Sequence, residues 1–239
     1  MNIRQKIILA TVLLLGSQMA NAAIALDRTR VIYNGQSKSV SLNLSNENKE
    51  LPYLAQAWIE DAQHQKVTTP LVVTPPVQRL EPGAKSAIKV SAMPEAMKLP
   101  QDRESLFYFN LREIPPRSEK TNVMQIALQT QIKLFYRPEA ITPKKGVIWQ
   151  EQTTLQQTAQ GYRIENPTPY YLIVIGLAEK NSAAAVDEFQ PLMIAPQSSA
   201  ELKSPAFSKP VVTYINDYGG RPTLDFNCNA GNCQVVKST

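Results

Sequence analysis

One long alternating run of residues constrains the fold of this chain more than any other feature. Residues 122–138 read NVMQIALQTQIKLFYRP, with apolar side chains at the even positions from 124 to 136 apart from Thr130 and polar ones at most odd positions. This alternation predicts a β-strand with one buried face, in a firm register because a one-residue slip would bury charge. At about 3.3 Å per residue the run would extend roughly 50 Å, about three times a usual strand. An ordinary sandwich cannot cover all of its apolar face.

The first 22 residues have the order of a secretory signal peptide. Arg4 and Lys6 precede an apolar run at 7–15, and small residues lead up to Ala22. We therefore expect export, cleavage after Ala22 and a mature chain that begins at Ala23. The apolar run is too short for a bilayer span, which needs about 20 residues, and no later segment supplies one, so membrane insertion is not expected.

The charge of the chain gives no sign of a nucleic-acid partner. Removing Arg4 and Lys6 with the leader lowers the formal net charge from +5 to +3. The remaining charges are scattered and form no block of one sign. A mildly basic chain of this kind does not favour nucleic-acid binding.

Short alternating segments, separated by turn residues and punctuated by 18 prolines, predict an all-β chain. We expect six or seven strands before Pro138, and no segment longer than about ten residues keeps a helical period. The strand pattern stops where prolines interrupt pairing and then resumes. The sequence thus predicts two β-sandwiches, at 23–137 and 147–239, joined by a linker at 138–146.

Two adjacent prolines leave one local feature open. Pro75 and Pro76 mark a loop or a strand edge. Because X-Pro bonds are rarely cis in folded proteins, a rigid turn is favoured over a cis bond, although sequence does not settle the choice.

The two cysteines predict a local disulfide. Cys228 and Cys233 flank NAGN between two alternating segments, so in an oxidising compartment they would close a bond across a hairpin. The small loop gives only about 2 kcal/mol by chain-entropy arithmetic. A redox or metal role is the weaker reading, because the spacing is not CxxC and the single histidine, His64, is far away in the sequence.

Enzymatic chemistry has little support. A nucleophilic pair would have to use His64, which lies in a polar loop, and no cluster of histidine, cysteine and carboxylate offers a metal site. No glycine-rich phosphate loop appears among the nine glycines. We predict a binding protein without catalytic residues, metal or cofactor. The long run fits recognition by strand addition, although strand and core could both simply be long.

Seven motifs resemble the periplasmic pilus (fimbrial) chaperones, and the similarity runs through nearly the whole mature chain. They are LDRTR at 26–30, LPYLAQAWIE at 51–60, TPPVQRLEPGAKS at 74–86, DRESLFYFNLREIPPRSEK at 102–120, IKLFYRP at 132–138, ENPTPYY at 165–171 and YINDYGGRP at 214–222.

The resemblance implies two immunoglobulin-like sandwiches in a boomerang, a periplasmic location and a role in pilus assembly. Such a chaperone lends a strand to pilus subunits, both pilins and adhesins, which lack their own last strand, and delivers them to an outer-membrane usher. The runner-up is a secreted immunoglobulin-like adhesin or carbohydrate-binding module. A self-capped homodimer of the subunit-free chaperone stays open.

The resemblance also assigns roles to individual residues. Met124, Ile126 and Leu128 would fill the groove of the subunit. Arg30 and Lys133 would grip its terminal carboxylate, because two cations that offer charge-assisted hydrogen bonds fix one end of a strand and so its register.

A further set of residues is expected to hold the two domains at their angle. Glu104, Arg137 and Asp217 match an ionic network of the family. Buried ion networks are weak evidence for stability, so we expect this one to set the geometry of the cleft.

Overall fold

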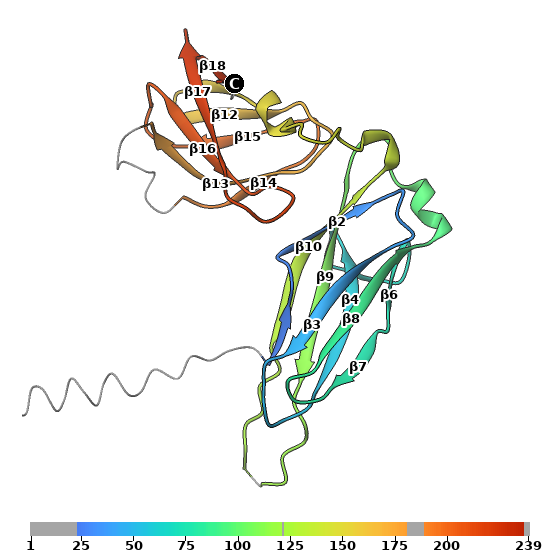
Figure 1. The fold of residues 1–239 in the computed structure, drawn as a ribbon. Coiled ribbons are helices and arrows are strands. Elements are labelled where there is room, and N and C mark those ends of the chain that lie inside the picture. The colour runs from blue at the N-terminus through green and yellow to red at the C-terminus, as the bar shows by residue number, and fades with distance from the viewer. Residues whose placement is uncertain (1–22, 121, 181–188, 237–239) are drawn as a thin grey trace, which may run out of the picture.

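Two β-sandwiches, joined at an angle, form the boomerang in Figure 1. The computed structural model describes residues 23–120, 122–180 and 189–236. Helical structure in these residues is confined to three short 3-10 turns, η1 (Pro94–Lys98), η2 (Glu139–Ile141) and η3 (Trp149–Gln152), and no described helix is long and apolar enough to cross a membrane. The predicted all-β class with two immunoglobulin-like sandwiches is confirmed.

The first sandwich packs a four-stranded sheet against a larger one. The smaller sheet has the order β1 (Ile24–Leu26), β3 (Ser39–Asn46), β8 (Lys85–Ala92) and β6 (Leu71–Thr74). The larger sheet has the order β2 (Arg30–Asn34), β10 (Gln129–Arg137), β9 (Ser105–Ile114), β4 (Tyr53–Asp61) and β5 (Lys66–Val67), with β7 (Val77–Leu80) also paired to β4. All pairs are antiparallel except β2 with β10.

Alternation along the strands explains how this core forms. In β9 the side chains of Phe107, Phe109 and Leu111 point inward and are buried in the core of the first sandwich. Ile132 and Leu134 of β10 lie in the same core. Because successive side chains of a strand point to opposite faces, the residues between them lie on the outer face, which is turned toward the second sandwich at one end.

The two adjacent prolines lie where the chain changes sheets. β6 ends at Thr74 and pairs with β8 of the smaller sheet, whereas β7 begins at Val77 and pairs with β4 of the larger one. Prolines cannot donate to a ladder, so they fit this crossing. The Thr74–Pro75 bond is cis, as is Thr69–Pro70. The preference for an ordinary rigid turn at Pro75 was therefore wrong.

The second sandwich is one continuous path of eight hydrogen-bonded strands. The order is β14 (Leu192–Ile194), β13 (Leu172–Glu179), β16 (Pro210–Tyr214), β17 (Thr223–Asn229), β18 (Asn232–Val235), β11 (Thr154–Thr158), β12 (Gly161–Asn166) and β15 (Ser198–Lys203). Residues 223–225 of β17 pair with β16 and residues 226–229 pair with β18, so this strand passes from one layer to the other.

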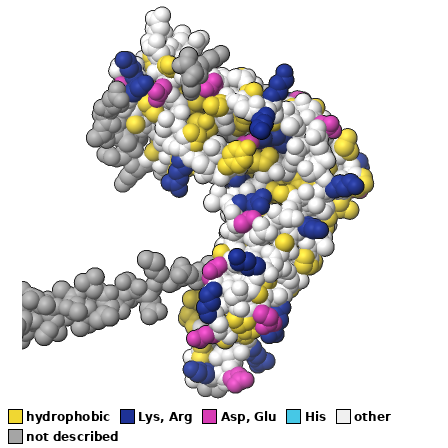
Figure 2. All heavy atoms as spheres, viewed as in Figure 1, with side chains coloured by type: hydrophobic (Ala, Val, Ile, Leu, Met, Phe, Trp, Pro, Cys, Tyr) yellow, Lys and Arg dark blue, Asp and Glu magenta, His cyan; other side chains and the backbone are white. Residues whose placement is uncertain are grey.

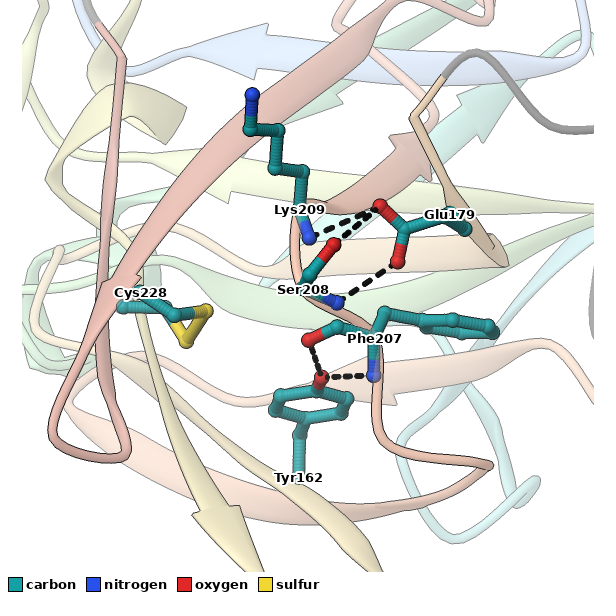
Figure 3. The surroundings of a disulfide bond; sticks show 7 residues. Tyr162, Glu179, Phe207, Ser208, Lys209 and Cys228 are labelled. Atoms are coloured by element: carbon teal, nitrogen blue, oxygen red, sulfur yellow. Dashed lines mark hydrogen bonds between the residues drawn. A yellow bond between two sulfur atoms is a disulfide. The ribbon is translucent and has the colours of Figure 1, made fainter.

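The predicted disulfide is present in this sandwich. Cys228 and Cys233 are direct cross-strand partners in the β17–β18 hairpin and are bonded to each other. Figure 3 shows the surrounding contacts, in which the hydroxyl of buried Tyr162 donates to the carbonyl of Phe207 at 2.8 Å and accepts its N–H at 2.7 Å. The carboxylate of Glu179 accepts the N–H of Ser208 in the same loop at 2.7 Å. The disulfide is thus a local staple beside an independent hydrogen-bonded loop.

The long strand is shorter than its alternation predicts. β10 begins at Gln129, and residues 123–128 lie outside any strand. The last contact with β9 is the bond from the N–H of Glu113 to the carbonyl of Leu128, at 3.0 Å. Pro115 and Pro116 follow β9 and offer no N–H, so the ladder cannot continue along residues 122–128.

Candidate functional site

The segment before β10 exposes three large apolar side chains at alternate positions. Met124, Ile126 and Leu128 are 86%, 65% and 47% exposed. They have the parity of Ile132, which is only 8% exposed in the core of the first sandwich. Figure 1 places this segment at the end of the first sandwich that is remote from the second. The core-facing stripe of β10 therefore continues beyond the domain as an uncovered apolar stripe.

Arg30 and Lys133 come together in the middle of the outer face. Lys133 of β10 and Arg30 of β2 are direct partners in the parallel pair, although 103 positions separate them in the sequence. Both are half-buried, and among the described residues neither makes a salt bridge. The structure thus brings the two predicted anchor residues side by side and leaves their charges without a paired carboxylate.

Burial and mutual repulsion disfavour the charged forms of this pair. Burial lowers the pKa of Lys133, and the positive charge of Arg30 lowers it further. Burial also lowers the pKa of Arg30, against a smaller opposing effect of Asp217. The Nε atom of Arg30 is buried and has no hydrogen-bond partner within the described part of the chain. An added carboxylate near the two cations would relieve the repulsion between them.

A hollow of about 410 Å³ opens beside Arg30 between the two domains. Figure 2 shows it between the lobes, with basic and hydrophobic side chains at its inner corner. Two arginines line the hollow. Arg28 is paired with Asp27 at 2.8 Å, whereas Arg30 makes no salt bridge among the described residues. The hollow is lined by Asp27, Arg28, Thr29, Arg30, Ile32, Asp217 and Tyr218.

The predicted interdomain network is assembled around Arg137, the last residue of β10. Its guanidinium lies 2.7 Å from Glu104 and 2.6 Å from Asp217, and stacks over the ring of Tyr170. The carboxylate of Glu104 also accepts the backbone N–H of Tyr171 at 2.8 Å. One buried cation of the first sandwich therefore contacts three separate groups of the second, directly or through Glu104.

Burial is costly for this network. Burial raises the pKa of Glu104 to about 7, and the guanidinium of Arg137 opposes the rise. Burial would lower the pKa of Arg137, but the hydrogen bonds and charges of Asp217 and Glu104 raise it above its ordinary value. Arg137 therefore stays charged. Because desolvation offsets much of the attraction in such a pair, the network is better suited to fixing an angle than to stabilising either domain.

Apolar packing reinforces the contact between the sandwiches. Leu106 and Phe135 of the first sandwich form a buried cluster with Ile173 of the second. The rings of Phe135 and Tyr171 lie 5.3 Å apart in a tilted arrangement. An apolar cluster thus lies beside the ionic network where the two sandwiches meet.

Sequence reasoning missed one exposed aromatic residue at the rim of the hollow. Tyr218 is 96% exposed and follows Asp217 in a tight turn, where the side-chain oxygen of Asn216 accepts the N–H groups of Tyr218 and Gly220. The motif YINDYGGRP contained the signal, because turn residues surround a large aromatic residue there.

Two family models together cover most of the chain. The model described as "Pili and flagellar-assembly chaperone, PapD N-terminal domain" matches residues 23–142. The model described as "Pili assembly chaperone PapD, C-terminal domain" matches residues 148–226.

Curated relatives and solved structures agree with these matches. The chain is 57% identical to the "Chaperone protein PapD" of Escherichia coli over 98% of this chain and 99% of that protein. It is 47% identical to the "Probable fimbrial chaperone YfcS" of Escherichia coli K12, over 95% and 91% of the two chains. Its fold is similar to a structure of the Salmonella enterica SafA pilin in complex with the SafB chaperone, with a TM-score of 0.74, 23% identity and coverage of 87% and 97%.

Proposed function

The chain belongs to the pilus-assembly chaperone family, and from this premise we propose how it holds a pilus subunit. The family is not enzymatic, and its members chaperone pilus subunits in the periplasm. This membership favours the chaperone over an adhesin or a carbohydrate-binding module.

The apolar stripe of residues 122–128 is the donated face. We assign Met124, Ile126 and Leu128 to a groove of the subunit, where strand addition would supply main-chain hydrogen bonds and the alternate side chains would enter pockets. Their exposure supports this assignment, since large apolar side chains gathered on a free edge would otherwise promote aggregation. The pilin bound to SafB in the similar structure offers a precedent for such a partner.

Arg30 and Lys133 are assigned to the terminal carboxylate of the subunit. The observation that carries the proposal is that these two cations are direct strand partners, half-buried and without a salt bridge among the described residues. A carboxylate between them would accept charge-assisted hydrogen bonds from both. Since Lys133 lies on β10, which follows the donated segment directly along the chain, and Arg30 is its partner, the anchor would set the register of the added strand.

The network of Glu104, Arg137 and Asp217 is assigned to the geometry of the cleft. Its contacts reach across the domain boundary, which we place in a linker at 138–146 between domains at 23–137 and 147–239. An unchanged angle would keep the anchor and the second sandwich in fixed positions around the subunit.

Delivery and processing complete the proposal. A leader at 1–22 would be cleaved after export, and an outer-membrane usher would receive the chaperone-bound subunit. A homodimer that covers the donated face in the absence of a subunit remains the alternative use of the same surface.

Alanine variants of the anchor test the function directly. Arg30→Ala and Lys133→Ala should each abolish recovery of a co-expressed pilin from periplasmic extracts, because each lost charged hydrogen bond costs about 1.5 to 3 kcal/mol and more if the carboxylate is left unpaired. The thermal midpoint of the free chaperone should change little, since neither side chain has a salt bridge to lose among the described residues.

A matched control removes a positive charge elsewhere. Arg79 is exposed and pairs with Glu81 at 2.7 Å on the first sandwich, so Arg79→Ala should leave pilin recovery unchanged. Normal recovery with both anchor variants would show that the carboxylate site is wrongly assigned.

A further inference from the structure

A carboxylate occupies a core-facing position at one end of the first sandwich. Phe107, Phe109 and Leu111 of β9 point into the core, and Glu113 is the next residue with the same parity. Its side chain is nearly buried, with Glu113 only 7% exposed. Charged groups are rarely buried unless they are paired, so this position calls for a partner.

The only polar contact of the Glu113 side chain among the described residues joins the two sheets. Its Oε2 atom accepts the backbone N–H of Ile24 at 2.7 Å. Ile24 lies on β1 of the smaller sheet, whereas Glu113 lies on β9 of the larger one. No lysine, arginine or histidine of the described part of the chain makes a salt bridge with Glu113. A single hydrogen bond from a neutral N–H offsets only part of the free-energy cost of burying a carboxylate.

Ala23 is held beside this carboxylate. It is buried, and its carbonyl accepts the N–H of Glu47 at 2.7 Å. Three covalent bonds of about 1.3 to 1.5 Å separate the backbone nitrogens of Ala23 and Ile24, so the nitrogen of Ala23 lies within about 7 Å of Glu113 Oε2.

Cleavage of the leader would change the chemistry of that nitrogen. Hydrolysis of the Ala22–Ala23 peptide bond consumes one water, leaves a carboxylate on Ala22 and frees an amine on Ala23. The amine takes up a proton near neutral pH, because an α-amino group has a pKa of about 7.7 to 8.0. A neutral amide beside Glu113 thus becomes a cation.

We propose that Glu113 is the binding site for the α-ammonium group of Ala23, so that processing completes an ion pair that ties β1 to β9. The inference rests on the proposed cleavage after Ala22 and not on subunit capture. The N–H of Glu113 also donates to Leu128 at 3.0 Å, where the donated segment leaves the sandwich. The ion pair therefore supports the base of that segment in the mature chain.

A double-mutant cycle on the mature protein tests this pair. One axis compares the chain that begins at Ala23 with a chain that carries one extra glycine before Ala23, which keeps the ammonium charge but moves it away. The other axis is Glu113→Gln, which keeps the acceptor for the Ile24 N–H. Mass spectrometry verifies each N-terminus.

The expected result is specific to Glu113. The extended wild-type chain should melt about 2 to 4 °C below the processed one, and Glu113→Gln should remove this difference. Glu47→Gln, which neutralises an exposed carboxylate near Ala23, should leave the difference intact. Equal midpoints of the two wild-type chains, or a difference that persists in Glu113→Gln, would overturn the proposal.

A second measurement needs no variant and reports on the amine itself. In the folded processed protein, acylation of the Ala23 amine should be at least about tenfold slower than in the unfolded protein, because a paired ammonium is a poor nucleophile. An equal rate in the two states would refute the pair even if Glu113→Gln failed to fold. Capture of a pilin is measured separately with the same proteins. If the ion pair is absent and capture is normal, the ion-pair proposal fails and the proposed function stands.

Discussion

Replacing Ile126 or Leu128 by serine should separate the donated face from the core of the first sandwich. In the free protein these side chains are 65% and 47% exposed, so they contribute only part of their burial energy to the fold. Full burial of such a side chain stabilises by about 1.5 to 3 kcal/mol, which leaves roughly 1 to 2 kcal/mol for Ile126 and about 0.7 to 1.4 kcal/mol for Leu128 to gain in a groove.

The serine hydroxyl adds a second cost in the complex. Burying it without a partner costs about 1 to 3 kcal/mol, so each variant should weaken capture at least about tenfold, the equivalent of 1.4 kcal/mol. The free energy of unfolding of the free variants should change little, because the hydroxyl stays in water there.

The assay compares folding and capture in the same variants. Denaturant melts give the stability of the free proteins, and competition between a tagged variant and untagged wild type for a limiting pilin gives relative affinity. Val123→Ser is the matched control, because Val123 is 49% exposed but has the opposite parity, and it should leave capture unchanged. Ile132→Ser should cost the free protein several kcal/mol, since Ile132 lies in the core. A comparably large loss of free-protein stability in Ile126→Ser and Leu128→Ser would refute the donated face.

Three further predictions concern charge, the disulfide and the interdomain angle. Burial and the charge of Arg30 lower the pKa of Lys133, so capture of a pilin should be complete below that lowered pKa and should weaken above it, at a lower pH than an ordinary lysine would allow. In Lys133→Arg, capture measured over the same pH range should persist at the pH values where the wild type loses it. Reduction of the Cys228–Cys233 bond should lower the free energy of unfolding by about 2 kcal/mol without loss of capture, and thiol titration of the unfolded exported protein should find no free cysteine. Asp217→Asn should weaken the contact with Arg137 by about 1.5 to 3 kcal/mol and broaden the interdomain angle distribution in solution scattering, and an unchanged scattering profile would contradict this role.

Periodicity predicted the faces of the long strands better than their ends. The alternation of β4, β9 and β10 indicated which side chains are buried, because a strand with one covered face needs a period of two. The same alternation continued through residues 122–128, where the structure has no strand. Pro115 and Pro116 end the neighbouring ladder, and a hydrophobic pattern does not report whether a backbone partner exists.

Short strands and distant pairs were beyond the reach of local patterns. β5 has two residues and β7 four, too few to establish a period. Arg30 and Lys133 were linked only by family resemblance, since parallel pairing of β2 with β10 joins segments that have no local sequence relation. Glu113 did carry a signal, because a charge at a core-facing position of an alternating segment marks a site that needs a partner.

The position of three functional groups along β10 and the segment just before it links subunit capture to the shape of the whole molecule. Counting about 3.3 Å per residue, Lys133 lies roughly 17 Å from the donated Leu128 and roughly 13 Å from Arg137, which contacts the second sandwich. The segment from Gln129 to Arg137 is paired on at least one side along its length, so these spacings cannot relax independently. A carboxylate fixed at Lys133 would therefore determine which subunit residues meet the donated face, since a slip of one residue would reverse every side chain. Arg137 ends the same strand and contacts Asp217 of the second sandwich. The position of the second sandwich would therefore be fixed relative to the carboxylate bound at Lys133.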